Sequence, residues 1–305
     1  MRPYASGSVA EGFLLVDKPG GWTSHDVVAH CRRLLGERRI GHAGTLDPMA
    51  TGLLVLGLGR ATRLLRFVQH LPKTYLAVAV LGVATDTLDA DGAVLSREPM
   101  PVGEDEVRQA AARFVGTIFQ VPPMVSARRV EGRRLYDLAR EGKEVEREAR
   151  AVEVHSLDLV DFAPSEYPEV TLRVCCSTGT YIRTLADDLA RALGGRAHLS
   201  ALRRLSVGSL RVEEAHVLAA VEVAAGEGVA GELLVEPATG LRDLPAVRVA
   251  TGTAGAVCHG AVFPTPLLGI DPAAPGLHRV LDSGGRLLAV YRVEGRAARP
   301  EVVVG

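Results

Sequence analysis

Asp47 is the residue whose surroundings point most clearly to chemistry. It is the only carboxylate in the stretch GHAGTLDPMATGLLVLGLG, residues 41–59. Gly44 and Gly52 on either side would let a substrate approach closely. A lone acid can serve as a nucleophile or general base when a cation holds it ionised, and the planar guanidinium of arginine suits that task best. The alternative is that Asp47 only ties the turn through an Asx-type hydrogen bond.

Arg183 is a candidate for that cation. It lies within GTYIRTLADDLARALG, residues 179–194, whose apolar spacing predicts an amphipathic helix. An arginine on a core-facing helix surface is rarely buried unpaired, so we expect a carboxylate partner, with a surface salt bridge as the alternative. Tyr75, near the start of an expected strand, and His42, just before the turn, are further polar candidates. An ordinary structural role is the alternative for both.

An arginine cluster lies in the segment SARRVEGRR, within a highly charged stretch over 124–151. Its members are Arg128, Arg129, Arg133 and Arg134. Such a density is typical of phosphate binding, although a solvated charged loop is also common. Residues 1–70 hold nine Lys/Arg against five Asp/Glu, and residues 211–305 hold eight against eleven. This asymmetry permits a basic binding face despite a net charge of −1.

The sequence predicts neither a metal nor a cofactor. The four cysteines form no C-x-x-C pair, and no His/Cys/Asp cluster has metal-ligand spacing. Free thiols fit a reducing cytoplasm. The segment MRPYASGSVAEG lacks the apolar core of a signal peptide, and no run of about 18 apolar residues suggests a membrane partner.

The surrounding pattern predicts the elements that position these residues. Apolar runs predict strands over 12–17, 51–59, 73–83, 151–162, 169–176 and 197–212, and helices over 24–36, 61–71, 104–116 and 179–194. Strands and helices without strict alternation favour an α+β fold with a mixed, largely antiparallel central sheet and flanking helices. We expect Ser24 to cap the first helix. The stretch 219–232 is a plausible boundary region.

Several motifs closely resemble those of the bacterial TruB family of tRNA pseudouridine synthases, in the family's order. GHAGTLDPMATGLLVLGLGRATR resembles its signature, and LLVDKPGGWTSHDVV resembles its opening Lys-Pro motif. KTYLAVAVLGVATDTLDADG and CSTGTYIRTLADDLA resemble its second and third motifs. PPMVSARRVEGRRLYDLAREG resembles its RNA-gripping insertion, and AHLSALRRLSVG resembles the strand that closes its pocket. The resemblance covers about residues 12–215.

The resemblance implies an isomerase of uridine 55 in the tRNA T loop, without a cofactor. It implies a catalytic domain over 1–240, with an insertion at about 124–151, and a small β-rich, PUA-like RNA-binding module over 247–305. Asp47 matches the family's catalytic aspartate, Arg183 its arginine partner and Tyr75 the tyrosine that stacks on the target base. The implied substrate-binding residues are His42, Lys18, Tyr181, Leu202 and the arginine cluster.

The resemblance also implies a monomer that binds the tRNA T arm without an obligatory protein partner. Asp47 could attack C1′, add to C6 of the base, or remove the 2′ proton to give a glycal, and the sequence does not choose among these. The target uridine must first flip out of the folded loop, where Tyr75 could stack on it and His42 could fill the vacated space. Three alternatives remain: a non-catalytic RNA-binding module, a small-molecule hydrolase that uses Asp47, and a pseudouridine synthase acting on ribosomal or small-nucleolar-guided RNA.

Overall fold

Eleven strands form one mixed sheet in the part of the chain that the computed structural model describes, residues 11–123, 129–130, 133–134 and 147–304. Its main order is β14-β1-β3-β12-β4-β11-β10-β7, with β2, β13 and β15 pairing at β3, β12 and β1. The bounds are β1 (Gly12–Lys18), β2 (Ile40–His42), β3 (Thr51–Leu58), β4 (Lys73–Leu81), β7 (Gly116–Gln120), β10 (Arg150–Ala163), β11 (Glu169–Cys176), β12 (Ala197–Val207), β13 (Leu210–Arg211), β14 (His216–Val217) and β15 (Leu234–Val235). Only the β1–β14 and β3–β12 pairs are parallel, so the expected mixed, largely antiparallel sheet is confirmed.

The strands β1 and β3 are apolar almost throughout because both of their faces are covered. Leu14 and Val16 of β1 point into one hydrophobic core, whereas Phe13 and Leu15 point into a second core on the opposite face. Side chains alternate between the two faces of a strand, so a strand covered on both sides shows no polar alternation. The strand β4 instead alternates buried with half-buried residues along its whole length.

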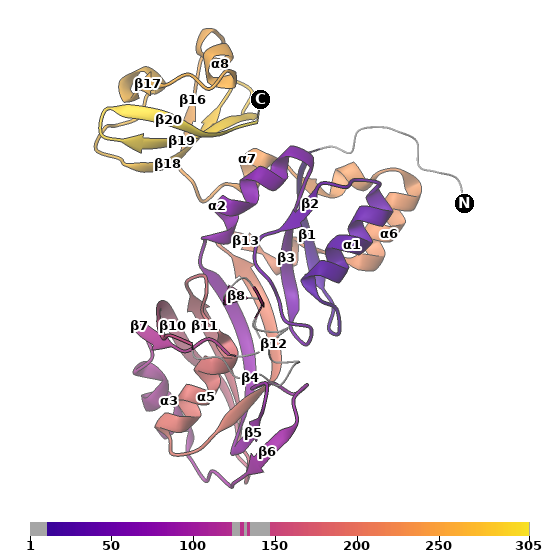
Figure 1. Cartoon of the computed structure of the whole chain (residues 1–305), viewed down its shortest axis with the longest axis vertical. Coiled ribbons are helices and arrows are strands. Elements are labelled where there is room, and N and C mark those ends of the chain that lie inside the picture. Colours follow the sequence, from indigo (N-terminus) through magenta and orange to yellow (C-terminus); the bar gives the residue numbers. More distant parts are fainter. Residues whose placement is uncertain (1–10, 124–128, 131–132, 135–146, 305) are drawn as a thin grey trace.

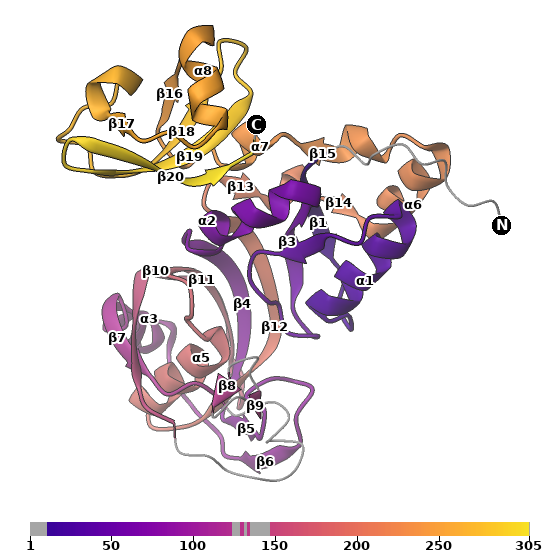
Figure 2. The same cartoon turned by 45° about the horizontal axis from the view of Figure 1, so that its top comes forward.

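Helices cover the two ends of the sheet (Figures 1 and 2). They are α1 (Ser24–Leu35), α3 (Glu104–Ala112), α5 (Ile182–Ala192) and α6 (Leu218–Glu227), with the short α2 (Leu65–Gln69) and α7 (Pro237–Gly240) and the 3₁₀ turns η1 (Gly59–Leu64), η2 (Val212–Glu214) and η3 (Ala230–Leu233). The helix α5 buries Ile182, Leu185 and Leu189, as its apolar spacing predicts. Two hairpins complete this part, β5 (Val83–Thr85) with β6 (Val94–Arg97) and β8 (Arg129–Val130) with β9 (Arg133–Arg134).

A separate five-stranded sheet forms the C-terminal module and lies at one end of the elongated molecule (Figure 1). It contains β16 (Ala246–Arg248), β17 (Phe263–Pro264), β18 (Gly276–Leu281), β19 (Leu287–Glu294) and β20 (Ala297–Val303), with α8 (Thr251–Cys258) and the 3₁₀ turn η4 (Thr265–Leu268). Leu287 and Val302 of this module share the second core with Phe67 of α2. The guanidinium of Arg66 also contacts Glu301 at 2.8 Å, so the module is packed against the larger sheet.

Two local expectations are wrong. Thr23, not Ser24, caps α1, because its side chain accepts from the backbone N–H of Asp26 while the Asp26 carboxylate accepts from the backbone N–H of Thr23. The expected boundary region at 219–232 is largely α6, whose Val221 is fully buried in the first core and which lies beside α1 in both views. Among the described residues, no helix is long and apolar enough to cross a membrane.

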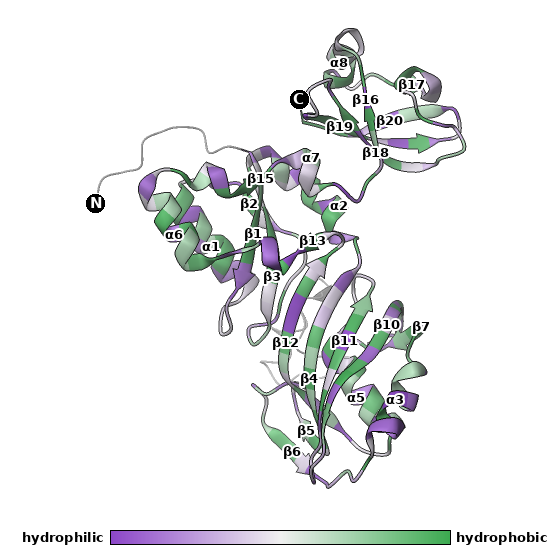
Figure 3. Cartoon of the chain, turned by 180° about the vertical axis from the view of Figure 1, so that it is seen from behind, coloured by the Kyte–Doolittle hydropathy of each residue, from purple (hydrophilic) through white to green (hydrophobic). Residues whose placement is uncertain are grey.

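Hydropathy along the strands follows this burial for most residues, and β12 contains one of the exceptions. Hydrophobic residues predominate along β11, whereas β12 carries a hydrophilic stretch in the middle of the molecule (Figure 3). That stretch contains Arg203 and Arg204, and Arg204 is only 1% exposed. A buried arginine in a central strand needs partners or a function.

Candidate active site

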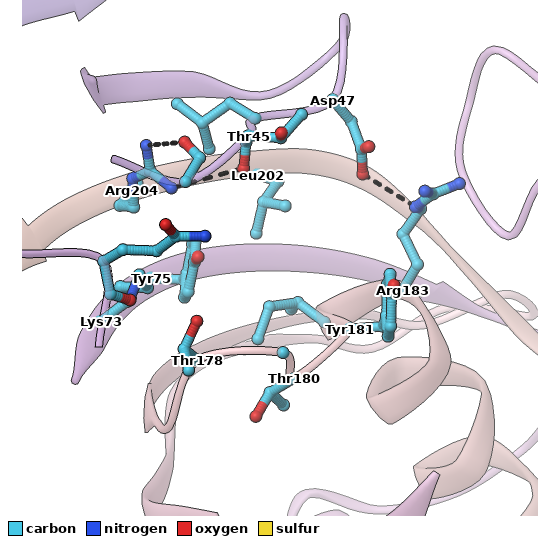
Figure 4. Close-up of a pocket in the computed structure, with 15 residues that line it drawn as sticks. Thr45, Asp47, Lys73, Tyr75, Thr178, Thr180, Tyr181, Arg183, Leu202 and Arg204 are labelled. Atoms are coloured by element: carbon cyan, nitrogen blue, oxygen red, sulfur yellow. Dashed lines mark hydrogen bonds and ion pairs between the residues drawn. The ribbon is translucent and has the colours of Figure 1, made fainter. Parts of the chain in front are cut away.

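A cavity of about 280 Å³ lies where the turn between β2 and β3 meets β4, β12 and the start of α5 (Figure 4). Five residues expected from the sequence line it: Asp47, Tyr75, Tyr181, Arg183 and Leu202. Two buried cations that were not expected, Lys73 and Arg204, also line it. The fold thus gathers residues that are up to 157 positions apart in sequence into one site.

The Asp47 turn is held by hydrogen bonds from the segment between β1 and α1. The Lys18 ammonium donates to the carbonyls of Pro48, at 3.2 Å, and Trp22, at 2.6 Å. The hydroxyl of Ser24 accepts from the backbone N–H of Leu46 at 2.8 Å. These bonds hold the residues on both sides of Asp47, so the carboxylate projects from a fixed turn.

Gly52 lets the turn pass close to β12. Its φ is +97°, and a Cβ atom there would lie 2.3 Å from the carbonyl oxygen of Arg204. Any side chain would therefore push β3 and β12 apart at the point where their parallel pairing begins. The glycine brings the turn and the Arg204 strand together, so the close approach at Gly52 is that of β12 and not the substrate approach that was expected.

Arg183 holds Asp47 and also a second carboxylate. Its Nε lies 3.0 Å from an oxygen of Asp47, and its Nη1 lies 3.1 Å from an oxygen of Asp89 and 2.8 Å from the carbonyl of Thr87. The side chains of Arg183 and Asp89 are 2% and 7% exposed, whereas Asp47 is 34% exposed at the cavity. The expected carboxylate partner of Arg183 is present, and the arginine divides its donors between two acids.

Asp89 was missed by the sequence reasoning. It lies in the turn TDTLDADG, where three acids within six residues suggest solvated charges. Leu88 just before it has a φ of +61°, a conformation that a branched side chain adopts rarely. That strained residue was not visible in the sequence, and nothing in the sequence connects position 89 with position 183.

Burial raises the pKa of the Asp47 carboxyl above its ordinary value, because the walls of the cavity remove part of its hydration. The Arg183 guanidinium opposes this shift, and the nearby Asp89 carboxylate adds to it. Burial also raises the pKa of the Tyr75 phenol, so this tyrosine is protonated at neutral pH. The site therefore combines an acid, whose pKa burial raises and an arginine opposes, with a neutral phenol.

The other expected residues take different positions. Leu202 is 7% exposed and gives the cavity an apolar wall, while the backbone N–H of Tyr181 donates to the buried side chain of Gln120 at 3.0 Å. His42 lies at the end of β2, with its ring 5.5 Å from that of His25. Burial, aided by the neighbouring His25, lowers the pKa of His42 to about 4, so its imidazole is neutral at physiological pH.

Lys18 does not occupy the expected position for RNA contact. Its side chain is fully buried, and its ammonium donates to three backbone carbonyls, the third being that of Pro19 at 2.8 Å. Burial lowers the pKa of Lys18 to about 8, although the Asp47 carboxylate opposes this shift. The geometry therefore gives Lys18 a structural role, in which its hydrogen bonds support the Asp47 turn.

The arginine cluster is only partly visible. Arg129 and Arg133–Arg134 form the short β8–β9 hairpin, whereas Arg128 and the side chains of all four arginines lie outside the described residues. In the ranges that are described, no group of three His, Cys, Asp or Glu could hold a metal ion.

Comparisons with known proteins show the family of the chain. A model of the TruB family pseudouridylate synthase N-terminal domain matches residues 32–182, and one of the tRNA pseudouridylate synthase B C-terminal domain matches residues 183–235. The tRNA pseudouridine synthase B of Ralstonia nicotianae is 45% identical and covers 96% of this chain and 94% of its own length. The protein of that name from Thermobifida fusca is 42% identical and covers 97% and 99%.

Solved structures with the same fold extend the comparison. The structure titled as a Cbf5-Nop10-Gar1 complex aligns with a TM-score of 0.74 at 27% identity, over 96% of this chain and 84% of that chain. An H/ACA RNP bound to a substrate RNA containing 2′-deoxyuridine aligns with a TM-score of 0.73 at 26% identity, over the same shares. The chain therefore belongs to the TruB family of pseudouridine synthases, and its substrate is tRNA.

Proposed function

We propose that this enzyme isomerises uridine 55 in the T loop of tRNA, and that Asp47 is the residue that reacts. The single observation that carries the proposal is the Asp47–Arg183 pair at 3.0 Å on the wall of a cavity. An acid held by an arginine, with open space beside it, fits attack on the ribose or base of a flipped nucleotide.

The remaining residues have roles that follow from their positions. Tyr75 offers a ring face for the uracil and Leu202 an apolar wall beside it, because both line the same cavity. Breaking N1–C1′ and joining C5 to C1′ consumes neither water nor redox equivalents, so one carboxylate suffices. His42, neutral and on the rim of the same turn, is suited to fill the space that the flipped base leaves.

Two further regions would position the tRNA around the cavity. The insertion near 124–151 carries the arginine cluster, which would contact phosphates on either side of the T loop. We also propose that residues 247–305 act as a PUA-like RNA-binding module attached to a catalytic domain over 1–240. Phosphate contacts fix the register of the RNA, whereas the shape of the loop selects the target.

The test is incubation of the purified chain with an unmodified tRNA transcript, followed by mapping of pseudouridine at single-nucleotide resolution. We expect modification at position 55 without any added protein or guide RNA. Asp47→Asn should abolish the reaction, whereas Asp91→Asn, a change in an exposed acid, should preserve it. Modification elsewhere in the tRNA would refute the site, and activity only on a guided RNA would favour the ribosomal alternative.

A further inference from the structure

Among the residues that the structure describes, two buried cations at one end of the cavity have no carboxylate partner. Lys73 is 4% exposed and Arg204 is 1% exposed. Lys73 donates to the carbonyls of Gln69 and Leu71, both at 2.7 Å. Within the described ranges, no acid lies within ion-pair distance of either side chain. Burying a charge without an opposite charge costs several kcal/mol in general, so their presence calls for an explanation.

The guanidinium of Arg204 is fixed in place beside Tyr75. Its Nε donates to the carbonyl of Leu53 at 2.7 Å, and its Nη2 donates to that of Gly44 at 3.1 Å. Arg204 is paired with Tyr75 across the β12–β4 ladder. Neutral carbonyls anchor the group but leave its positive charge uncompensated, so the charge acts on the cavity.

The two ends of the cavity differ in charge. Figure 4 shows Arg204, Lys73 and Tyr75 on one side and the Asp47–Arg183 pair on the other, with Leu202 between them. Burial and the charge of Arg204 lower the pKa of Lys73 to about 8, and the same charge lowers the pKa of His42. The cationic end of the cavity therefore has a positive electrostatic potential, which favours binding of an anion.

The proposed isomerisation generates such an anion on the uracil ring. When the N1–C1′ bond breaks, its electron pair stays with the ring and spreads over N1, O2 and O4. Bond formation from C5 to C1′ then releases the C5 proton, and N1 gains a proton, so the net change is zero. Addition of Asp47 to C6 would also leave negative charge on the ring, so the requirement holds for each of these routes.

We propose that Arg204, assisted by Lys73, is a catalytic residue that stabilises the negative charge of the uracil ring, an inference that rests on the proposed Asp47-dependent reaction. Fixed donors aimed at developing charge in a dry site are among the strongest contributions to catalysis. A backbone phosphate is the other possible anion. It fits less well because the chain must continue from it on both sides, whereas both cations are at least 96% buried.

The test compares single-turnover rates on two tRNA transcripts, with uridine or 5-fluorouridine at the target position, measured by nucleoside chromatography as loss of the starting nucleoside. Fluorine takes the place of the C5 proton and cannot leave as a proton does, so the 5-fluorouridine reaction stops once C5 has joined C1′. Fluorine at C5 withdraws electrons and stabilises the ring anion without help from the protein. Arg204→Gln should slow the uridine reaction by about 100-fold or more, the loss typical of one such donor, and slow the 5-fluorouridine reaction at least tenfold less. Lys73→Gln should show the same selectivity with a smaller loss.

Arg203→Gln is the matched control. It is the neighbouring arginine of the same strand, but its side chain is 39% exposed and pairs with Asp17 at 2.7 Å. This variant should keep the wild-type ratio of the two rates. Asp47→Asn should be inactive on both substrates. Activity of this variant would refute the proposed function, but it would not change how the ratio of the two rates in Arg204→Gln is interpreted.

Three outcomes would overturn the proposal. Equal slowing of both substrates by Arg204→Gln would assign Arg204 a structural role. A loss confined to tRNA affinity, with a normal rate at saturation, would assign the cations to a phosphate. If thermal melting shows that Arg204→Gln does not fold, Lys73→Gln decides, and equal slowing of both substrates by that variant refutes the proposal.

Discussion

Replacing Asp89 by asparagine tests whether the second acid holds Arg183 in place. The Nη1 of Arg183 lies 3.1 Å from Asp89, and both side chains are nearly fully buried. At an effective dielectric constant of about 20, that separation corresponds to about 5 kcal/mol of attraction before desolvation is subtracted. Asparagine keeps an oxygen that can accept the hydrogen bond, and Asp47 remains as a counter-charge. We therefore expect a net loss of about 2–3 kcal/mol in the free energy of unfolding.

The loss should appear in both stability and turnover. For a chain of this length, about 1 kcal/mol corresponds to roughly 2 °C, so the Tm should fall by about 4–6 °C in calorimetry. A guanidinium that shifts by about 1 Å would misplace Asp47 and reduce kcat by about 100-fold. KM for tRNA should change little, because Asp89 is buried behind Arg183 and does not line the cavity.

The control substitution for Asp89→Asn lies in the same turn. Asp91 is exposed, and its backbone N–H donates to Asp89, a bond that substitution of the Asp91 side chain preserves. Asp91→Asn should therefore change the free energy of unfolding by less than about 0.5 kcal/mol. An Asp89→Asn variant with wild-type Tm and kcat would show that Asp47 alone is enough to hold Arg183.

Three further predictions concern charge. Asp47→Asn should abolish turnover but leave the unfolding free energy at pH 7 within about 1 kcal/mol of wild type. The pKa of the Asp47 carboxyl is raised in the folded state, so this carboxyl makes the wild-type protein more stable as the pH falls through that pKa. Urea titrations of the variant should not show this increase in stability at low pH. The wild-type kcat should fall above about pH 8 as Lys73 loses its proton. Lys73→Arg stays charged and should retain more of its kcat above that pH. An identical decline in kcat at alkaline pH in both proteins would refute a catalytic role for the Lys73 charge. Replacing Arg129 and Arg133 by alanine should weaken tRNA binding and reduce its log–log salt slope by about one unit per lost phosphate contact, measured by titration at several salt concentrations; an unchanged slope would mean that these arginines do not contact phosphates.

The sequence predicted the helices and strands of the site better than the contacts between its side chains. The spacing of apolar residues in α5 and β4 placed Arg183 and Tyr75 correctly on a helix and a strand, because those elements obey their own periodicity. The partnership with Asp89 joins residues 94 positions apart and depends on a strained turn. No local pattern encodes such a contact.

Arg204 was overlooked although a signal for it was present. In a strand, alternate residues share a face, so the expected placement of Leu202 in the pocket also places Arg204 there. The two arginines of LRRL were not singled out, and buried unpaired arginines are rare. Lys18 was assigned to substrate binding through the resemblance of its Lys-Pro motif, whereas the fold buries its side chain completely.

The parallel pairing between β3 and β12 also determines when the central sheet can be completed during protein synthesis. Gly52 of β3 is paired with Arg204 of β12, 152 residues later in the chain. A ribosome that adds 5–20 residues per second needs on the order of 10 s to make the intervening segment. During that interval β2 covers this edge of β3 only at its far end, and the end at Thr51 and Gly52 has no strand beside it. Such long-range pairings form slowly because loop closure must come first. The nascent N-terminal half should therefore need protection from aggregation until β12 emerges.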